Sequence, residues 1–218
     1  GIFRKNIRLI AGKPLIAWTI MAALAVKEVD CVVVSTDDDE IASIARNAGA
    51  EVPFVRPPGL SDDTTGTGAV IRHAIGQLEV DTTVDEVCLV YPAAVFITVD
   101  DLVSALEELR SGPDLDYVFA ATSFPAPIQR ALAVSLDGLV AMTQPEHLLS
   151  RSQDLAEHFH DVGQFYWGRR DAWMQSIPAM SGRSVIHQIP RWRVQDIDTP
   201  EDWVRAEVLY ELITRVDP

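Results

Sequence analysis

Two carboxylates at a spacing of two, Asp196 and Asp198, have the residue types and the spacing best suited to chemistry in this sequence. In an extended segment, side chains alternate between faces, so both carboxylates point one way while Ile197 points the other. Such oxygen-only surroundings suit Mg²⁺, which keeps several waters and bridges substrate phosphates. The spacing therefore predicts a divalent metal site at Asp196 and Asp198.

The same stretch also has the pattern of a helix start. Thr199 would be the N-cap, Pro200 the first helical residue, and Asp202 would close a capping box. Capping explains these three residues but gives no reason for Asp196 and Asp198 to be neighbours. Both interpretations stay open, and the metal site is favoured.

Two further polar stretches could hold an anion. Residues 4–6 (Arg-Lys-Asn) precede a strand-like segment, and residues 56–67 form a long polar loop before a helix. Loops at the carboxyl ends of strands bind ligands in open α/β sheets, and amides at a helix start can hold an anion. An ordinary solvated loop explains residues 56–67 equally well, because Gly, Ser and Thr are common in any turn.

Three consecutive aromatic residues occupy positions 165–167, and a place in the core is the simpler explanation for them. In an extended segment, however, Gln164 and Tyr166 share one face and Phe165 lies on the other. A polar side and an apolar side can therefore coexist on this segment.

Composition limits the possible partners. The net charge of −14 would repel nucleic acid and anionic lipid, so we expect neither as a partner. A small anion such as a nucleoside triphosphate remains possible, because a divalent cation can neutralise it. No apolar run approaches the roughly 18 residues that span a bilayer, and no secretory pattern is seen, so a cytoplasmic location is expected. Cys31 and Cys88 lie in apolar, strand-like runs and are predicted to be buried core thiols.

Apolar runs alternate with helical patterns, which is typical of βαβ units and predicts an α/β fold with a mainly parallel sheet and helices on both faces. The predicted helices are 13–26, 37–48, 67–78, 99–110 and 200–213, and the predicted strands are 31–35, 51–56, 86–91, 117–122 and 184–188. Residues 130–134 and 139–143 predict a β-hairpin. We expect one domain, 1–218, with a projecting insertion at about 124–160. A lone hairpin is marginal in water, so a homodimer through this insertion is expected.

Several segments in order resemble one enzyme family. They are Gly-Lys-Pro-Leu-Ile-Ala at 12–17, Val-Val-Val-Ser-Thr-Asp-Asp at 32–38, His-Asp-Val-Gly-Gln-Phe-Tyr-Trp-Gly at 160–168 and Arg-Val-Gln-Asp-Ile-Asp-Thr-Pro-Glu-Asp-Trp at 193–203. The chain resembles, nearly from end to end, the CMP-sugar synthetases, or acylneuraminate cytidylyltransferases. Within them it is most similar to the pseudaminic acid cytidylyltransferases.

The resemblance implies a Rossmann-like nucleotidyltransferase that transfers CMP from CTP to the anomeric hydroxyl of a nine-carbon acidic sugar and releases pyrophosphate. Pseudaminic acid is the sugar of the branch that the chain resembles most. Two alternatives stay open: the same reaction on sialic or legionaminic acid, or a catalytically silent sugar-binding or dimer-partner protein.

The resemblance also implies residue roles. Asp196 and Asp198 would hold Mg²⁺, and Lys5 would contact phosphate. The implied nucleotide contacts are Asn6 and Arg56, together with Ser61 and Asp62 of the polar loop. The implied sugar pocket is Tyr91, Gln144, Gln164, Phe165 and Tyr166. Arg151 would bind the sugar carboxylate across a dimer interface.

The sequence departs from the family pattern at two places. The family opens with a strand and a loop similar to Pro-Ala-Arg-Gly-Gly-Ser-Lys, of which only Gly1 and Ile2 remain here, with Phe3 where a Pro is usual. The first strand and the phosphate loop are therefore expected upstream. Residues 91–96 read Tyr-Pro-Ala-Ala-Val-Phe where the family resembles Tyr-Pro-Thr-Ala-Pro-Phe, so a hydroxyl near the substrate is absent at Ala93.

Overall fold

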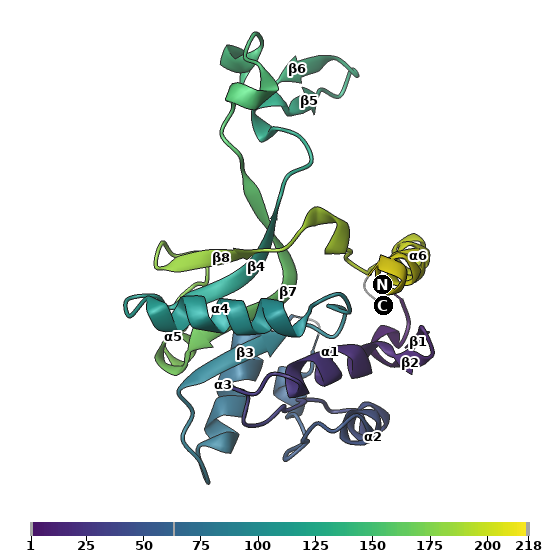
Figure 1. Cartoon of the computed structure of the whole chain (residues 1–218), viewed down its shortest axis with the longest axis vertical. Helices are drawn as coiled ribbons and strands as arrows, with labels where there is room; N and C mark the ends of the chain where they lie inside the picture. Colours follow the sequence, from purple (N-terminus) through teal and green to yellow (C-terminus); the bar gives the residue numbers. More distant parts are fainter. Residues whose placement is uncertain (1, 63, 217–218) are drawn as a thin grey trace.

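The fold is a four-stranded mixed sheet covered by helices on both faces, seen in a computed structural model that describes residues 2–62 and 64–216 (Figure 1). The sheet strands in spatial order are β3 (Glu86–Val90), β7 (Phe159–Arg169), β4 (Tyr117–Ser123) and β8 (Ser184–Gln188). The shorter strands are β1 (Leu9–Ile10), β2 (Lys13–Pro14), β5 (Leu132–Val134) and β6 (Val140–Met142). The helices are α1 (Leu15–Leu24), α2 (Asp39–Asn47), α3 (Thr67–Leu78), α4 (Val99–Ser111), α5 (Arg170–Met174) and α6 (Pro200–Val216).

The prediction of a mainly parallel sheet is wrong. Strands β4 and β8 are parallel, but β7 runs antiparallel to both of its neighbours, β3 and β4. The chain leaves the sheet at the end of β4, passes through the projecting segment and returns directly as β7. A return beside the strand just left, without a crossover helix, must be antiparallel.

Helices pack on both faces of the sheet, as predicted. On one face, α1 and α4 enclose a core in which Leu106 packs with Val118 and Phe165. On the other face, α3 and α5 pack around Ile75 and Tyr117. Strand alternation separates the two cores, because successive residues of β4 and β7 point to opposite faces.

Local sequence signals set several element ends. Helix α4 begins at the predicted capping box, in which Thr98 and Asp101 bond to each other's backbone N–H groups. Asp38 caps α2 by accepting hydrogen bonds from the two N–H groups of Glu40 and Ile41, and Gly49 follows that helix with a φ of 101°. The predicted bounds of α3 and β8 agree with the structure at both ends.

The segment around Cys31 differs from its prediction. Residues 31–35 and 51–56 form no strand of the sheet, and only an isolated parallel bridge joins Val33 to Glu51. Cys31 is exposed, so its prediction as a core thiol is wrong, whereas Cys88 on β3 is half-buried and its pKa is raised by burial. An apolar run is buried as a strand only when neighbours pair with it, and among the described residues β3 pairs with β7 alone.

A projecting segment leaves the sheet between β4 and β7 and ends in the predicted β-hairpin, β5 and β6 (Figure 1). Large apolar side chains are exposed along it: Leu132, Val134, Leu136, Leu139, Val140, Leu148 and Leu149. Within the described residues, no helix is both long enough and apolar enough to cross a membrane.

A charged contact between β8 and α4 should make stability depend on pH. His187 lies 3.5 Å from an Asp101 carboxylate oxygen and 3.3 Å from one of Glu108. These carboxylates raise the pKa of His187 against the effect of its burial. A raised folded-state pKa gives stability that is complete below the unfolded value of about 6.5 and is lost as the pH rises through the folded value.

We therefore expect the free energy of unfolding to fall as the pH rises above about 6.5, and His187→Gln to reduce that fall. Urea unfolding at several pH values measures it. His147→Gln, on the projecting segment, is the matched control and should leave the slope unchanged. An unaltered slope in His187→Gln would contradict this interpretation.

Candidate functional site

The segment from 196 to 202 shows the alternation on which the metal prediction depends, and it also shows the predicted helix cap. Asp196 and Asp198 are exposed, whereas Ile197 between them is fully buried. The capping box is also present, because Asp202 accepts from the Thr199 N–H at 2.8 Å and donates its own N–H to the Thr199 hydroxyl at 3.2 Å. The cap uses the side chains of Thr199 and Asp202, so it does not compete for the carboxylates of Asp196 and Asp198.

Two carboxylates are a sufficient protein contribution for Mg²⁺. Among the described residues, no three His, Cys, Asp or Glu side chains gather into a metal cage. Mg²⁺ is usually bound by one or two carboxylates, with water and substrate phosphates as the remaining ligands. The oxygen-only pair Asp196 and Asp198 therefore fits Mg²⁺ better than it fits zinc, which prefers His and Cys.

Lys5 lies beside these carboxylates, although it is 193 residues from Asp198 in the chain. Its Nζ donates to the Ile197 carbonyl at 2.5 Å and to Asp198 Oδ1 at 2.9 Å. Lys5 belongs to a short 3₁₀ turn that follows Arg4, whose φ of 50° is left-handed. The structure thus brings Lys5, the predicted phosphate contact, to Asp198, one of the two predicted metal ligands.

Asn6 adjoins the same group. A cavity of about 290 Å³ is lined by Ile2, Arg4, Lys5, Asn6, Asp38 and Ile41. Arg4 pairs with Asp38 at 3.2 Å and with Glu40 at 2.6 Å, so the N-terminal turn is fastened to the start of α2. The cavity therefore presents both charge signs next to Asp198.

Arg56 and Ser61 form a second polar group. The Arg56 guanidinium donates to Asp37 at 3.1 Å and to the Ser61 hydroxyl at 3.2 Å. The hydrogen bond from Arg56 is the main cause of the lowered pKa of Asp37. Asp37 precedes Asp38, so this group begins next to a residue that lines the cavity.

Tyrosine side chains form a third group, at the end of β3 and in β7. The hydroxyls of Tyr91 and Thr67 are 3.3 Å apart, and the rings of Tyr91 and Tyr166 meet edge to face at 6.2 Å. Tyr166 also stacks on Phe119 and donates its hydroxyl to Asp161. Burial, and then Asp161, raise the pKa of Tyr166 well above its usual value, so this hydroxyl stays a donor.

A bulge in β7 explains why Asp161 was not predicted. Phe119 pairs with Tyr166 but Ala121 pairs with Asp161, so the register shifts within β7, and Gly163 there has a φ of 58°. Such a bulge redirects side chains and brings Asp161 to Tyr166. Strict alternation in the sequence cannot reveal this contact.

Gln164 links the tyrosines to the carboxylate segment. Its carbonyl accepts from the Tyr91 N–H at 2.9 Å, and its side-chain amide donates to the Arg193 carbonyl at 3.3 Å. Gln164 is 4% exposed. Gln164 is therefore placed between two predicted parts of the site.

Four predicted site residues lie apart from these groups. Phe165 is fully buried in the core against α4, because it faces away from Tyr166, so its placement in the sugar pocket is not supported. Asp62 binds Thr64 and Thr65 within its own turn, and its pKa is lowered to about 2 by those hydrogen bonds. Gln144 and Arg151 lie on the projecting segment, where Arg151 pairs with Asp154 at 2.8 Å.

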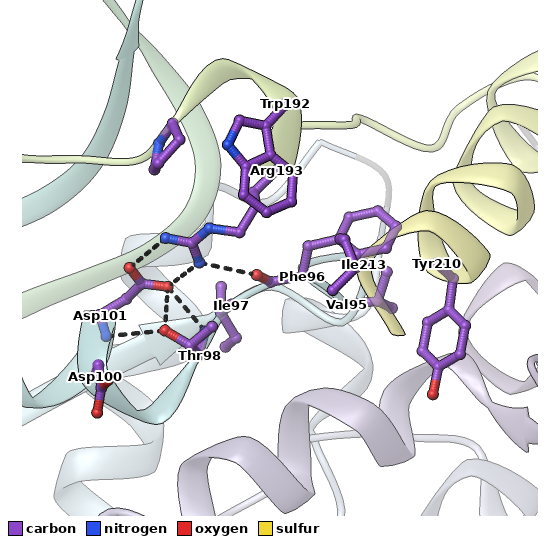
Figure 2. A pocket seen from close by; sticks show the side chains of 11 residues that line it. Val95, Phe96, Ile97, Thr98, Asp100, Asp101, Trp192, Arg193, Tyr210 and Ile213 are labelled. Carbon is purple, nitrogen blue, oxygen red and sulfur yellow. Dashed lines mark hydrogen bonds and ion pairs between the residues drawn. The ribbon is translucent and has the colours of Figure 1, made fainter. Parts of the chain in front are cut away.

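Another cavity lies elsewhere, between the start of α4, residues 190–193 and α6 (Figure 2). Its volume is about 420 Å³, and Phe96, Thr98, Asp101, Trp192 and Arg193 are among its lining residues. None of the predicted site residues lines it.

Comparison with known proteins gives a consistent result. The family model described as cytidylyltransferase matches residues 1–164. A pseudaminic acid cytidylyltransferase of Campylobacter jejuni subsp. jejuni serotype O:2 is 40% identical over 96% of this chain and 90% of its own length. A CMP-N,N'-diacetyllegionaminic acid synthase of Legionella pneumophila is 31% identical over 95% of this chain and 90% of its own length.

Solved structures show the same fold at low identity. A CMP:2-keto-3-deoxy-manno-octonic acid synthetase complexed with CTP aligns with a TM-score of 0.67 at 18% identity, covering 95% of this chain and 92% of that one. A 4-diphosphocytidyl-2C-methyl-D-erythritol synthase from Anaerococcus prevotii aligns with a TM-score of 0.65 at 13% identity, covering 94% and 93%. With the match to the family model and the identity to curated relatives, these findings lead to one conclusion: the chain belongs to the cytidylyltransferase family.

Proposed function

We propose that this protein transfers CMP from CTP to the anomeric hydroxyl of pseudaminic acid and releases pyrophosphate. The observation that carries the proposal is the contact of Lys5 with Asp198 beside the cavity that Asn6 lines. A lysine that lines a cavity and also contacts one of two neighbouring carboxylates suits a metal-bound triphosphate. The curated relative that is 40% identical over 96% of the chain supports the choice of sugar.

The reaction asks the protein mainly for positioning and charge neutralisation. The anomeric hydroxyl loses its proton to solvent and its oxygen bonds to the α-phosphorus. The bond from that phosphorus to the bridging oxygen breaks, and pyrophosphate leaves with its electron pair. Asp196 and Asp198 would hold Mg²⁺, which supplies neutralisation of phosphate charge when bound. Lys5 would exchange its bond with Asp198 for a phosphate oxygen, and Asn6 and Arg56 would orient the nucleotide.

The tyrosine group is proposed to face the sugar. Tyr91 and Tyr166 present hydroxyls beside Thr67 and Asp161, and Asp161 fixes the direction of the Tyr166 O–H. Fixed polar groups discriminate well between sugars that differ in hydroxyl or amide position, because a mismatched sugar leaves a buried group unpaired.

Steady-state pyrophosphate release with CTP and each of three sugar acids tests the proposal. We expect the highest kcat/KM with pseudaminic acid, and lower values with legionaminic and sialic acids. Equal values for the three sugars would contradict the assigned specificity. If no sugar yields pyrophosphate but a sugar still binds in calorimetry, the protein is catalytically silent and the proposal is wrong.

A homodimer is proposed to complete the site through the projecting segment. The exposed leucines and valines of that segment favour association with a second copy, because a two-stranded hairpin needs another surface to cover its apolar face. The segment extends away from the four-stranded sheet, whose strand β7 carries Tyr166 (Figure 1). Gln144 and Arg151 lie on this segment. In a twofold dimer both could reach the site of the partner.

A further strand is proposed beside β3. Among the described residues, the edge of β3 away from β7 pairs with no strand, and Val33 has a single bridge. An unpaired edge of apolar residues is avoided in stable proteins. A strand there would carry the phosphate loop that the family resemblance implies.

A further inference from the structure

A buried ion pair ties the carboxylate segment to α4 (Figure 2). Arg193 donates from Nη1 to Asp101 Oδ2 at 2.5 Å and from Nη2 to Oδ1 at 2.8 Å. The two side chains are 14% and 7% exposed. Arg193 also donates to the Phe96 carbonyl at 3.3 Å, so the guanidinium holds the loop that follows Tyr91 as well.

Asp101 is a fixed partner for this arginine. It closes the capping box with Thr98 in the first turn of α4, and His187 of β8 approaches its other oxygen. Burial alone would raise the pKa of Asp101, but the hydrogen bonds from Arg193, His187 and Thr98 outweigh it and hold the pKa below its usual value. The carboxylate therefore stays ionised and keeps both bonds to Arg193.

Arg193 is held by its backbone as well. Its carbonyl accepts from the Gln164 side chain, whose own carbonyl binds the Tyr91 N–H. The loop after β3, strand β7 and the chain that leads to Asp196 thus all meet at Arg193.

The carboxylates themselves have little regular structure to support them. Residues 194–198 belong to no helix or strand. After the segment, the capping box at Asp202 holds the chain, and within it Ile197 is buried in the core. Before the segment, the chain is held by Arg193, three residues ahead of Asp196.

We propose that Arg193 and Asp101 are positioning residues of the reaction, and that their ion pair sets where Asp196 and Asp198 hold a divalent cation. The inference rests on the proposed function and adds two residues to it. A buried ion pair stabilises little more than apolar residues of equal volume, but two parallel bonds fix a direction. Residues that orient metal ligands from the next shell typically change metal affinity or activity about 10- to 100-fold when substituted.

The neighbouring cavity makes the pair sensitive to substitution. Both residues line the cavity of about 420 Å³, so packing does not surround them completely. A shortened or singly bonded side chain would have room to move, and the carboxylate segment would move with it.

Arg193→Lys tests the proposal because it keeps the charge and loses the fork of two bonds. The matched control is Arg183→Lys, which alters a second forked pair, Arg183 with Asp116 at 2.7 and 2.7 Å, that joins the starts of β4 and β8. Three quantities are measured for each variant. Electron paramagnetic resonance gives the affinity for Mn²⁺ in the presence of CTP. Pyrophosphate release gives the Mg²⁺ requirement, and thermal unfolding gives the melting temperature.

We expect Arg193→Lys to raise the Kd for Mn²⁺ by about 10-fold. The Mg²⁺ concentration that gives the half-maximal rate should also rise by about 10-fold. Arg183→Lys should lower the melting temperature without changing either metal value. Asp101→Asn keeps the size of the side chain and an acceptor oxygen for the cap. It should shift both metal values in the same direction, and it replaces Arg193→Lys as the test if that variant does not fold.

Unchanged metal values in the folded Arg193 or Asp101 variant overturn the inference, even if the melting temperature falls, because the pair would then be structural only. A wild-type protein that binds no Mn²⁺ with CTP present is a different failure. It removes the metal assignment at Asp196 and Asp198, and the inference with it.

Discussion

Asp198→Asn should lower kcat for CMP transfer by about 1,000-fold, the largest effect expected of a single substitution here. The change removes one of two proposed metal ligands and the partner of Lys5 at 2.9 Å, while it keeps the size of the side chain. Its cost in stability should be small, because Asp198 is exposed and exposed ion pairs contribute about 0–1 kcal/mol. Pyrophosphate release at increasing Mg²⁺ measures the effect, and high Mg²⁺ should recover part of the rate.

Asp202→Asn is the matched control for this substitution. Asp202 closes the capping box of α6 and lies four residues from Asp198, but it is not a proposed metal ligand. We expect it to lower the melting temperature slightly, because the cap of α6 is weakened, and to leave the Mg²⁺ requirement near that of the wild type. Full Mg²⁺-dependent release in Asp198→Asn would show that the metal assignment is wrong.

Arg151→Ala should raise the KM for the sugar acid by about 100-fold, within the range of ~2–5 kcal/mol for an anion left unpaired. A guanidinium pairs with a carboxylate through two parallel bonds, which suits a sugar acid. The present partner of Arg151 is Asp154, in an ion pair of two exposed side chains that costs little to break. Arg205→Ala, at an equally solvent-facing pair with Glu201, is the control.

The steady-state constants of Arg151→Ala decide the assignment. A raised KM for CTP together with an unchanged KM for the sugar would contradict it, because the guanidinium would then serve the triphosphate.

Mixing variants tests whether Arg151 acts across a dimer. A dimer of one Arg151→Ala chain and one Asp198→Asn chain has one complete site if the arginine comes from the partner, so random exchange should restore about a quarter of the wild-type activity. If the arginine acts in its own chain, neither site of the mixed dimer is complete and no activity returns. Val134→Lys on the projecting segment should give a monomer in sedimentation and abolish the recovery. Val80→Lys, at a similarly exposed position in the turn after α3, should do neither.

The sequence by itself determined the features that depend on neighbours along the chain. The capping box at Thr98, the bounds of α3 and β8, and the hairpin of β5 and β6 follow from contacts within a few residues, and the structure confirms them. The alternation of exposed Asp196 and Asp198 around buried Ile197 has the same local origin. Family membership was likewise readable from the order of short segments, as the comparisons confirm.

Tertiary structure decided which distant segments meet. The antiparallel place of β7, the exposure of Cys31 and the burial of Phe165 depend on which strands pair and which helices cover them. Asp101 shows the reason most clearly: its sequence signal identifies a helix cap, but its bond to Arg193 joins residues 92 positions apart. Hydrophobic periodicity and capping patterns describe contacts over one or two helical turns, so they carry no information about a partner that only folding brings near.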